Sequence, residues 1–234
     1  MKNKIECSVC KNEKCLVKQG CFGEWLDKIS TSKYQHWYKK GDYIFREGEP
    51  IYGIYFIQQG GVKVVTTSLH GREQIVRLAK EGQILGHRGV GRTKYYFNSV
   101  ALTDSLLCFV ENELFYEACM SCPKFAYNLI FFYASELRRA ELRVKFQAQM
   151  NIREKVAMAF MYCHEVFGMN SETKKLGISL SRQDIADLAG TTAEQVTRQL
   201  RDFESEKLIA RNKREIIFLN INELENIISD YKIE

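Results

Sequence analysis

The sequence predicts an α+β protein with three parts: an N-terminal β-roll, one long helix, and a C-terminal domain of short helices followed by a β-hairpin. Between Tyr38 and Val110, short β-branched and aromatic runs alternate with glycine-containing turns, which is typical of a compact all-β unit. No glycine or proline lies between Pro123 and Gly168, so a long helical stretch follows the roll. Two helix-capping motifs on either side of a glycine then indicate a pair of short helices near the C-terminus.

The composition is that of a globular protein large enough for two modest domains. The chain has 234 residues, of which 45% are hydrophobic. It has no unbroken apolar run of the roughly 18 residues that a membrane span requires, and its first residues lack the apolar core of a secretory signal. We therefore expect a cytoplasmic protein with no membrane partner, in which the eight cysteines are not paired as disulfides.

The net charge of +5 does not by itself indicate a nucleic-acid partner. From residue 151 onward the chain has 12 Lys and Arg against 14 Asp and Glu, whereas the preceding part has 22 against 15. The C-terminal part is therefore slightly acidic. Any nucleic-acid binding there must depend on the local placement of arginines and not on bulk charge.

The β-roll is expected to occupy residues 22–122, after a cysteine-containing segment at 1–21. Its predicted strands are short and are separated by turns that contain glycine. This spacing is typical of a roll or barrel, in which closure of the sheet protects the strand edges. The clearest predicted strands are Tyr43–Phe45, Ile54–Ile57, Val62–Val65, Gln74–Leu78 and Leu106–Val110.

The long helix is expected at residues 123–150, where Pro123 is acceptable in the first turn. Apolar residues recur along it at steps of three to five, and charged residues fill the flanks. A helix with such a seam needs a partner, and we expect its own copy in a two-fold parallel homodimer. The alternative is that the seam packs on the chain's own roll, and we expect the upper half of the helix, with Phe131, Phe132 and Tyr133, to do both. The predicted seam consists of Leu129, Phe132, Leu137, Ala140 and Val144.

The C-terminal domain is expected at residues 151–234, and its strongest signal is a helix-turn-helix. Ser181 and Asp184 have the spacing of a capping box, so a short helix begins there and ends before Gly190. Thr192 and Gln195 have the same spacing and begin a second helix. Two short helices joined by a tight glycine turn form the arrangement that places its second helix in the major groove of DNA.

The second of these helices has an apolar face, which we expect to be core, and a polar face suited to a major groove. Arg198 can donate two hydrogen bonds to guanine, Glu194 can accept one from cytosine, and Thr197 can place a methyl group against thymine. The apolar face consists of Val196, Leu200 and Phe203, and the polar face consists of Glu194, Gln195, Thr197, Arg198 and Arg201.

Two further features complete a predicted winged helix-turn-helix. The N-termini of both short helices offer free backbone donors for DNA phosphates, with polar side chains beside them. Residues 207–218 predict two strands around a polar turn at Asn212–Lys213, which we interpret as the wing. The alternative is an ordinary helical hairpin with a solvated charged face, but the order of capped helices, glycine turn and basic hairpin argues against it. The predicted phosphate-contacting residues are Ser181, Arg182, Gln183 and Thr192.

The same segment resembles the helix-turn-helix of the cAMP receptor protein and FNR family. The resemblance is carried by Ser-Arg-Gln-Asp-Ile-Ala at 181–186, by Gly190, and by Glu-Gln-Val-Thr-Arg at 194–198. The segments at 40–48 and 55–64 resemble the opening strands of the family's cyclic-nucleotide-binding-type domain. The similarity covers nearly the whole chain in the family's order.

The resemblance implies a transcription regulator that binds a palindromic operator as a homodimer, with half-sites about one helical turn apart, and that contacts RNA polymerase. The FNR branch contacts bases with Glu, Ser and Arg, whereas the cAMP receptor branch has an additional Arg before the Glu and Gly in place of Ser. This chain has Ala193, Glu194, Thr197 and Arg198 at these positions. It is therefore closer to the FNR branch, which implies a TTGA-like half-site.

The resemblance also places an effector pocket in the roll, at residues 86–101. Family members that bind a cyclic nucleotide use a Gly-Glu pair for the ribose and a later Arg-Ser or Arg-Thr pair for the phosphate. Here histidine stands in place of the glutamate, and two tyrosines stand where the phosphate pair is expected. This argues against cyclic AMP and leaves another small anion open. The candidate pocket residues are Gly86, His87, Arg92, Thr93, Tyr95 and Tyr96.

The cysteines offer a second candidate sensing site. Cys7, Cys10 and Cys15 lie within nine residues, and FNR carries a similar N-terminal trio with a fourth cysteine in a segment like that around Cys108. Four thiolates could hold a [4Fe–4S] cluster whose lability to oxygen would switch the dimer off. The second gap is one residue shorter than in FNR, Cys21 follows, and structural zinc fits the spacing nearly as well. A third possibility is that the cysteines bind nothing.

No enzymatic motif competes with this interpretation. The sequence lacks a Walker-type phosphate loop, a His-Glu-x-x-His pair and a Gly-x-Ser-x-Gly elbow. None of the four histidines has a nearby Ser or Cys at a spacing that would recommend catalysis. We therefore expect a regulator and not an enzyme.

Overall fold

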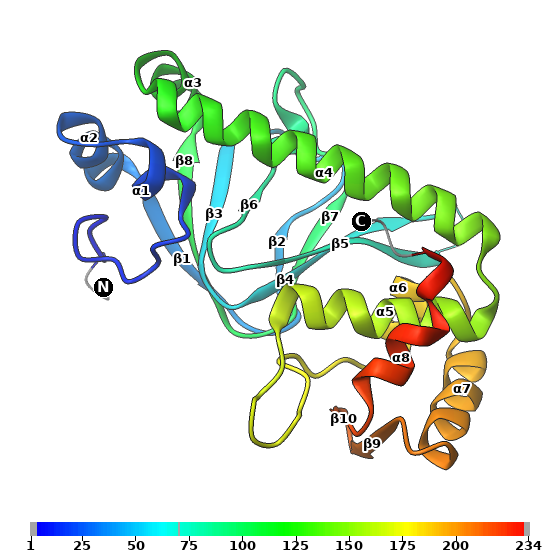
Figure 1. Cartoon of the computed structure of the whole chain (residues 1–234). Coiled ribbons are helices and arrows are strands. Elements are labelled where there is room, and N and C mark those ends of the chain that lie inside the picture. The colour runs from blue at the N-terminus through cyan, green and yellow to red at the C-terminus, as the bar shows by residue number, and fades with distance from the viewer. Residues whose placement is uncertain (1–3, 70, 232–234) are drawn as a thin grey trace. The chain divides into compact units, whose positions relative to one another are not determined.

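The computed structural model describes residues 4–69 and 71–231, which form two compact units (Figure 1). The roll unit consists of the described residues up to Thr67 together with Arg77–Arg138. The DNA-binding unit, so named for the helix-turn-helix predicted in it, consists of the described residues of Ser68–Val76 and those from Arg139 onward. Each unit is described by itself.

Two four-stranded sheets form the roll, and every strand predicted from the sequence is confirmed. One sheet has the strand order β1-β8-β3-β6, and the other has the order β2-β7-β4-β5. The strands are β1 Tyr34–Tyr38, β2 Tyr43–Phe45, β3 Gly53–Gln59, β4 Gly61–Thr67, β5 Glu73–Lys80, β6 Ile84–Leu85, β7 Asn98–Ala101 and β8 Ser105–Glu111.

Close backbone packing fixes the pairing of β3 with β8. Phe56 lies opposite Cys108 in this antiparallel pair, and Ile54 lies opposite Val110. Gly53 is required at the start of β3, because a Cβ atom there would lie 2.2 Å from the Val110 carbonyl oxygen. The register therefore places Cys108 on an interior strand of its sheet, where its side chain is 9% exposed.

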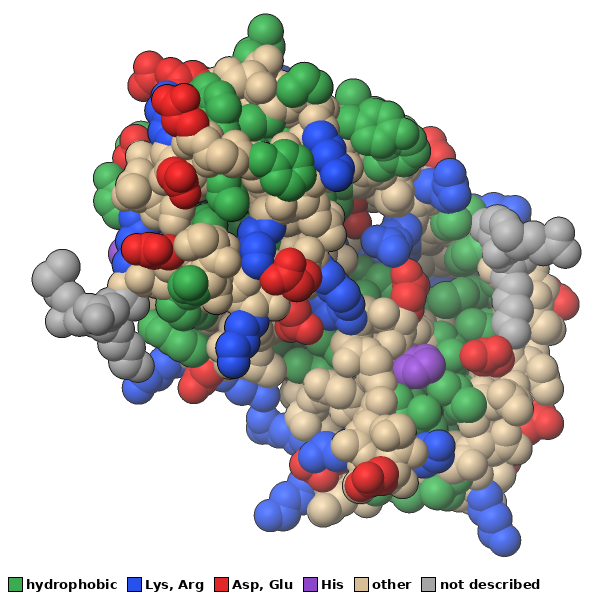
Figure 2. Space-filling model, turned by 60° about the vertical axis from the view of Figure 1, so that its left-hand side comes forward, with side chains coloured by type: hydrophobic (Ala, Val, Ile, Leu, Met, Phe, Trp, Pro, Cys, Tyr) green, Lys and Arg blue, Asp and Glu red, His purple; other side chains and the backbone are tan. Residues whose placement is uncertain are grey.

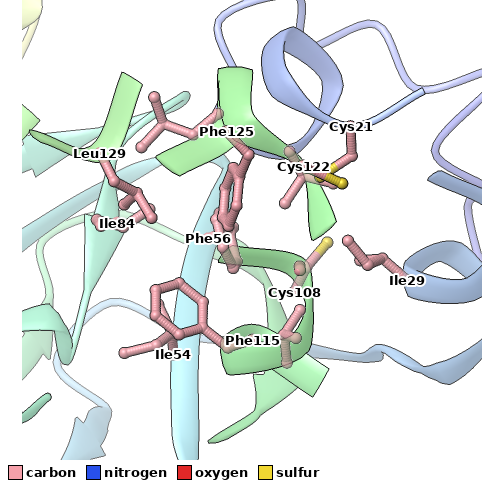
Figure 3. Packing of buried hydrophobic residues seen from close by; sticks show 14 residues of the cluster. Cys21, Ile29, Ile54, Phe56, Ile84, Cys108, Phe115, Cys122, Phe125 and Leu129 are labelled. Carbon is pink, nitrogen blue, oxygen red and sulfur yellow. The ribbon is translucent and has the colours of Figure 1, made fainter. Parts of the chain in front are cut away.

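Three short helices enclose the core of the roll unit against this sheet. Figure 3 shows Ile29 and Phe115, from two of these helices, gathered with Phe56 in one apolar cluster. Gly20 packs so tightly that a Cβ atom there would lie 2.4 Å from the Phe125 Cα. The two N-terminal helices are therefore part of the core. The three short helices are α1 Leu16–Gly20, α2 Glu24–Ser32 and α3 Asn112–Ser121.

The long helix α4 spans Pro123–Gln149, as the sequence predicts, and its upper half packs on the roll as expected, but the predicted apolar seam is not one continuous face. Leu129 is buried in the roll core and Phe132 packs against that core, whereas Ala140 is exposed. Only Leu137 and Val144 of the predicted seam lie on a solvent-exposed apolar face. The helix has apolar residues on two faces, and the predicted seam combined them.

The DNA-binding unit has the element order of a winged helix-turn-helix. Its first helix begins after Asn151, which forms a reciprocal capping box with Glu154. Phe160 and Phe203 meet in the core with ring centroids 6.4 Å apart. The elements are α5 Ile152–Phe167, α6 Arg182–Ala189, α7 Ala193–Ser205, β9 Ile209–Asn212, β10 Glu215–Phe218 and α8 Ile221–Ile227.

The length of α4 does not make it a membrane span. Its 27 residues include buried Glu136 and several exposed arginines. Within residues 4–69 and 71–231, we find no helix that is both long and apolar enough to cross a membrane.

Candidate DNA-binding and sensing sites

Side-chain caps and a left-handed glycine build the turn between α6 and α7. The Ser181 hydroxyl accepts a hydrogen bond from the Asp184 N–H at 3.0 Å, and the Asp184 carboxylate accepts one from the Ser181 N–H at 3.0 Å. Gly190 ends α6 with a φ of 66°, where a side chain would be strained. The predicted first capping box and the glycine turn are confirmed. Arg182 and Gln183 are exposed in the first turn of α6.

The second cap is only half of the predicted box. Thr192 accepts a hydrogen bond from the Gln195 N–H at 3.4 Å, and α7 begins directly afterwards. The Gln195 side chain, however, accepts a hydrogen bond from the Thr191 hydroxyl. Because Gln195 has this neighbouring partner, the predicted reciprocal box is wrong, although the helix begins where predicted.

The helix α7 has one buried face and one exposed face, as predicted. Val196 and Phe203 are completely buried, and Leu200 is 2% exposed. Hydrogen bonds from its own backbone N–H and from Thr192 lower the pKa of Glu194, so its carboxylate is an ionised acceptor at neutral pH. The fully exposed members of the predicted polar face are Glu194, Gln195, Arg198 and Arg201.

Thr197 is half-buried on the same helix, and its hydroxyl is already engaged. The hydroxyl donates to the Ala193 carbonyl oxygen, one turn earlier, at 2.7 Å. This bond leaves the methyl group as the part of the side chain that is free for a contact. The arrangement favours an apolar contact by Thr197 over a donated hydrogen bond.

The predicted wing is present, but its turn lies one residue later than expected. Asn212 pairs with Glu215 in the antiparallel hairpin of β9 and β10, which leaves Lys213 and Arg214 as the two turn residues. Lys213 adopts a positive φ of 57°, as a two-residue hairpin turn requires. The sequence contains no glycine at this position, so the turn was predicted at Asn212–Lys213, one residue too early. Both turn side chains are exposed.

Ion pairs leave two arginines of α7 free for a partner. Arg153 forms a bidentate pair with Glu206, at 2.7 and 2.6 Å, and Arg211 pairs with Glu204. Arg198 and Arg201, by contrast, take part in no ion pair with another described residue. On the face shown in Figure 2, Lys and Arg side chains are interspersed with Asp and Glu. The positive charge that α7 itself offers to a partner is therefore that of Arg198 and Arg201.

A heptad pattern of exposed residues runs along α4. Their spacing alternates between three and four, which is the spacing of a coiled-coil seam. Ile130 is 65% exposed, Leu137 is 62% exposed and Val144 is 74% exposed, so this face is uncovered in the single chain. The residues of the heptad face are Tyr127, Ile130, Ala134, Leu137, Glu141, Val144 and Ala148.

The four predicted ligand cysteines line one cavity in the roll unit. Cys7, Cys10 and Cys108 are buried, and Cys15 is partly buried, around a space of about 20 Å³. Burial raises the pKa of the Cys15 thiol to about 11. Cys21 is not part of this cavity and instead lies beside Cys122 in the apolar core (Figure 3).

The side chains that line this cavity are of the type that binds a metal through thiolates, although their positions are not those of a formed metal site. Within the described chain, no three His, Cys, Asp or Glu side chains are close enough to hold one metal ion. Binding would require the turns at residues 7–15 to bring the thiols together. The lining has the chemistry of an anionic thiolate site, since it contains four thiols, Lys18 and Lys33, and no carboxylate.

The predicted effector pocket is a small cavity of about 30 Å³ in the roll unit. Tyr95 is 7% exposed and stacks on Phe45 with ring centroids 4.0 Å apart, so this conformation has no room for a nucleotide. Arg92 and Thr93 do not line the cavity and lie in an exposed loop. The predicted residues that line it are Gly86, His87, Tyr95 and Tyr96.

His87 is the most unusual residue of this cavity. It is 3% exposed, and neither ring nitrogen makes a hydrogen bond of good geometry among the described residues. Burial, together with the charges of Arg77 and Arg88, lowers the pKa of His87 well below its usual value. The imidazole is therefore neutral at physiological pH.

Two protein-family models match the chain, and together they cover about two thirds of it. The model for the cyclic nucleotide-binding domain matches residues 35–122, and the model for the Crp-like helix-turn-helix domain matches residues 154–227. The two matches fall on the roll and on the helix-turn-helix, in the order that the CRP/FNR regulators have. The chain belongs to the CRP/FNR family. It is a DNA-binding transcription regulator of the CRP/FNR type.

Relatives of this CRP/FNR regulator include several proteins that are themselves named as regulators. The Fumarate and nitrate reduction regulatory protein of Vibrio cholerae is 24% identical over 85% of this chain and 79% of its own length. The Regulatory protein HlyX of Actinobacillus pleuropneumoniae is 22% identical over 94% of this chain and 95% of its own. Electron transport regulator A of Shewanella oneidensis is 24% identical over 83% of this chain and 78% of its own.

Solved structures agree with the fold of this CRP/FNR regulator. FixK2 from Bradyrhizobium japonicum superposes with a TM-score of 0.75 at 23% identity, over 83% of this chain and 96% of that chain. A CooA mutant from Carboxydothermus hydrogenoformans superposes with a TM-score of 0.69 at 17% identity, over 84% of this chain and 88% of that chain. The likeness establishes the roll, the long helix and the helix-turn-helix as one known architecture.

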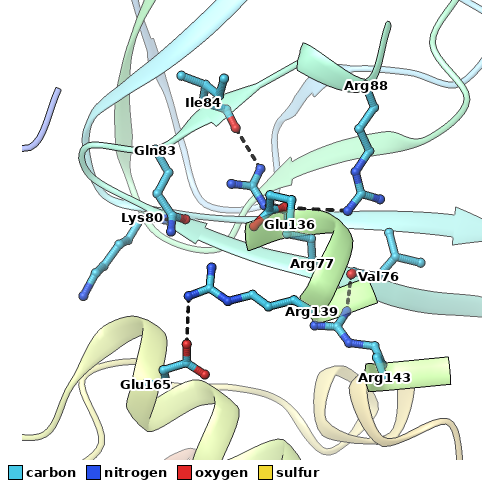
Figure 4. Close-up of polar contacts among 10 residues, drawn as sticks. All are labelled: Val76, Arg77, Lys80, Gln83, Ile84, Arg88, Glu136, Arg139, Arg143 and Glu165. Atoms are coloured by element: carbon cyan, nitrogen blue, oxygen red, sulfur yellow. Dashed lines mark hydrogen bonds and ion pairs between the residues drawn. The ribbon is translucent and has the colours of Figure 1, made fainter. Parts of the chain in front are cut away.

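The roll of this CRP/FNR regulator also buries an ion pair that the sequence did not reveal. Arg77 Nε lies 2.6 Å from Glu136 Oε2, and both side chains are less than a tenth exposed (Figure 4). Arg77 also donates to the Ile84 carbonyl oxygen at 2.7 Å, and Arg88 lies 3.7 Å from the same carboxylate. In the sequence, Glu136 is one of many charged residues on α4, and no local signal marks it as buried.

Proposed function

We propose that this CRP/FNR regulator acts as a homodimer that inserts α7 into the major groove of a palindromic operator, and that it responds to redox conditions through its cysteines. The observation that carries the DNA-binding part is the exposed face of α7. That face presents an ionised acceptor at Glu194 and the unpaired guanidinium of Arg198, one turn apart. These are the two side chains that discriminate C and G at base edges.

In the proposed interface, some residues contact the bases and others contact the phosphates. Arg198 donates to guanine, Glu194 accepts from cytosine, and the Thr197 methyl contacts thymine. The helix N-termini bind phosphates and set the register on the duplex, together with the hairpin turn. The phosphate-contacting side chains are Ser181, Arg182, Gln183, Thr192, Gln195 and Arg201, with Lys213 and Arg214 of the wing.

Operator selection tests the assignment of Thr197. The similarity of Glu194, Thr197 and Arg198 to the FNR branch gives a TTGA-like half-site as the expected preference. Thr197→Gly removes the methyl group and should relax the choice at one thymine of the half-site while leaving the neighbouring positions unchanged. An unchanged base preference in the selected operators would remove Thr197 from the interface.

The heptad face of α4 is proposed as the dimer interface. A parallel pair of such helices would bury Ile130, Leu137 and Val144 against their copies. Leu137→Arg places a charge in this seam, so sedimentation should show monomers at micromolar concentration, and operator binding should fall with dimerisation. A Leu137→Arg protein that remains dimeric would show that another surface joins the two chains. A substitution of the neighbouring Glu136, such as Glu136→Asp, cannot serve as a control for Leu137→Arg, because Glu136 is buried in the roll.

The cysteine cavity is proposed as the sensing site, with a [4Fe–4S] cluster ahead of zinc. Cys7, Cys10, Cys15 and Cys108 come from two distant segments and all line this cavity. Relatives are named anaerobic and fumarate–nitrate regulators, which favours a site that responds to oxygen. A bound iron–sulfur cluster would supply an oxygen-labile centre. The part of this chain is to present four thiolates and to tie residues 7–15 to the strand that carries Cys108.

Anaerobic purification separates the alternatives. Brown protein whose broad visible absorption bleaches in air, with iron and sulfide in the chain, is the expected result. Colourless protein with one zinc per chain would select a structural zinc site. Metal-free protein would leave the roll cavity as the sensing site.

The second candidate is a small anionic effector in the roll, and His87 is the observation that favours it. A buried imidazole without a good hydrogen bond, with Arg77 and Arg88 beside it, is a place where a small anion would gain partners. The size of the cavity argues against cyclic AMP. A thermal-shift screen of small anions tests this candidate, and no shift with any of them would remove it.

Two further partners follow from the proposed role. A regulator that binds operators must act where the DNA is, which in a bacterial-type system is the cytoplasm. A CRP/FNR regulator also contacts RNA polymerase, and we expect this of the operator-bound dimer. Co-sedimentation of polymerase with the operator complex tests this contact, and a signal that does not depend on the operator would count against it.

A further inference from the structure

Lys33 is one of the few charged side chains buried in the roll unit. It follows the last residue of α2 and is 3% exposed. Its ammonium Nζ donates to Cys7 Sγ at 3.2 Å, and it lines the same cavity as Cys10, Cys15 and Cys108. The flexible stem of a lysine usually lets the charged end reach water. Here the ammonium ends among thiols.

This ammonium lacks an anionic partner. No ion pair between Lys33 and a carboxylate occurs among the described residues, and Cys7 Sγ is the one side-chain atom to which it donates. An ammonium removed from water carries a large desolvation penalty unless an anion is close by. The burial of Lys33 therefore indicates that the cavity holds negative charge in its working form.

A second lysine at the same cavity shows the contrast. Lys18 Nζ lies 2.6 Å from Glu13 Oε1 and also donates to the Cys10 carbonyl oxygen at 2.6 Å. Its charge is therefore balanced by an acid that belongs to the protein. No such acid pairs with Lys33 within residues 4–69 and 71–231, so Lys33 depends on the cysteines for its counter-ion.

We propose that Lys33 is the fixed counter-charge of the cysteine site and favours a metal–thiolate centre of net negative charge. The inference rests on the proposed metal binding at Cys7, Cys10, Cys15 and Cys108. Lys33 ligates nothing and is a positioning residue: its ammonium holds a positive charge 3.2 Å from Cys7 Sγ, beside the proposed centre. A [4Fe–4S] cluster and a zinc ion held by four thiolates both carry net negative charge, so the role is the same for either.

Lys33→Met separates this role from a packing role, because it keeps the length of the stem and removes the charge. Metal affinity should fall by about 10–100-fold, as is typical when an outer-shell partner of a metal ligand is lost. The metal-free protein should be at least as stable as wild type, because an apolar group replaces an ammonium that lacks an anion. A residue needed only for packing would lower the stability of the metal-free protein as well.

A bound iron–sulfur cluster gives a further readout. One-electron reduction adds negative charge to the site, and a nearby positive charge favours the more negative form. Lys33→Met should therefore shift the midpoint potential to a lower value. The same shift should make bleaching in air faster than in wild type.

The experiment compares full-length wild type, Lys33→Met and Lys28→Met. Lys28 is a matched control on α2, because its ammonium pairs with Glu117 at the surface at 2.6 Å. Zn²⁺ affinity is measured by chelator competition, and iron and sulfide retention is measured after anaerobic reconstitution. Thermal unfolding is followed in the metal-free forms. We expect weaker metal binding for Lys33→Met alone, with no fall in its metal-free melting temperature.

Each outcome decides one question. Wild type that binds neither zinc nor an iron–sulfur cluster would end the proposed function of the cysteines, and this inference with it. Wild type that binds metal, with Lys33→Met binding equally well, would overturn only the role of Lys33. Metal-free Lys33→Met that melts below wild type would show a structural role and would also overturn the assignment.

Discussion

The roll unit and the DNA-binding unit differ in where they keep their polar side chains. A buried polar group costs free energy unless it has partners, so burial of this kind is uncommon. In the roll unit, such groups include charged side chains and a histidine. Among the described residues, the buried polar side chains of the roll unit are Ser30, Lys33, Arg77, His87, Ser99, Ser105 and Glu136, and that of the DNA-binding unit is Asp187.

This difference follows from what each unit contacts. The helix α7 keeps an apolar interior and displays Glu194, Arg198 and Arg201 to solvent, where a duplex can reach them. The roll instead encloses charges beside its cavities, where a small group or a metal centre can change their balance. Under the proposed function, recognition of DNA depends on surface chemistry, whereas the response to a signal depends on interior chemistry.

The largest effect is expected from breaking the buried pair of the roll. Glu136→Leu should lower the free energy of unfolding by about 3–5 kcal/mol, because it leaves the buried Arg77 charge without this carboxylate. Arg77→Met should cost less, because Arg88 still lies 3.7 Å from the Glu136 carboxylate. The double variant should lose much less than the sum of the two. Urea unfolding followed by tryptophan fluorescence measures this, since Trp25 and Trp37 both belong to the roll unit.

A surface pair provides the control for this prediction. Lys28 and Glu117 are each 46% exposed, and Lys28→Met should cost at most about 1 kcal/mol. Single variants of the buried pair that cost no more than this control would show that burial does not distinguish the two pairs.

The next largest effect is expected from the exposed face of α7. Arg198→Ala should weaken operator binding by about 1–3 kcal/mol, or roughly 5–150-fold, and relax specificity at one base pair. Fluorescence anisotropy with specific and unrelated duplexes at one salt concentration measures both effects. Arg214→Ala at the hairpin turn should weaken binding to both duplexes alike. An Arg198→Ala protein that loses affinity for both equally would assign Arg198 to the phosphates.

A smaller effect is expected from the pH dependence of the roll. Because the folded state lowers the pKa of His87, the unfolded state binds more protons below its own pKa of about 6.5. The free energy of unfolding should therefore fall as pH drops below 6.5, by up to about 1.4 kcal/mol per pH unit. His87→Phe should remove this slope between pH 6.5 and 5.5. His36→Gln should not, because His36 is exposed; equal slopes in all three proteins would refute the assignment.

The smallest effect is expected from the helix caps of the DNA-binding unit. Asn151→Ala removes a reciprocal capping box and should cost about 1 kcal/mol. Thr192→Ala removes a single, long cap bond and should cost less. Thermal unfolding followed by circular dichroism compares the two. A larger loss of stability for Thr192→Ala than for Asn151→Ala would mean that the Thr192 cap contributes more than its 3.4 Å hydrogen bond suggests.

Local signals explain why most of the DNA-binding unit could be predicted from the sequence. Ser181, Asp184 and Gly190 act within a few residues of chain, so their roles are visible in the sequence itself. The buried and exposed faces of α7 are visible in the sequence as well, because apolar and polar residues alternate with the period of the helix. The hairpin turn was displaced because its left-handed position is occupied by Lys213 in place of glycine.

Contacts between distant segments explain what could not be predicted. The seam of α4 was mixed because Leu129 and Ile130 are equally apolar, and only the folded roll decides which of them is covered. Lys33 and Cys7 lie 26 residues apart, and Arg77 and Glu136 are further apart still. The grouping of the four cysteines was expected from resemblance, whereas the lysine beside them had no signal in the sequence.

The ion pair between Arg211 and Glu204 joins the wing to α7, the helix that we propose enters the major groove. Helix and hairpin are thereby held as one template before any DNA is present. A regulator built this way loses little conformational freedom when it docks, so more of its contact energy is left to distinguish one operator from another.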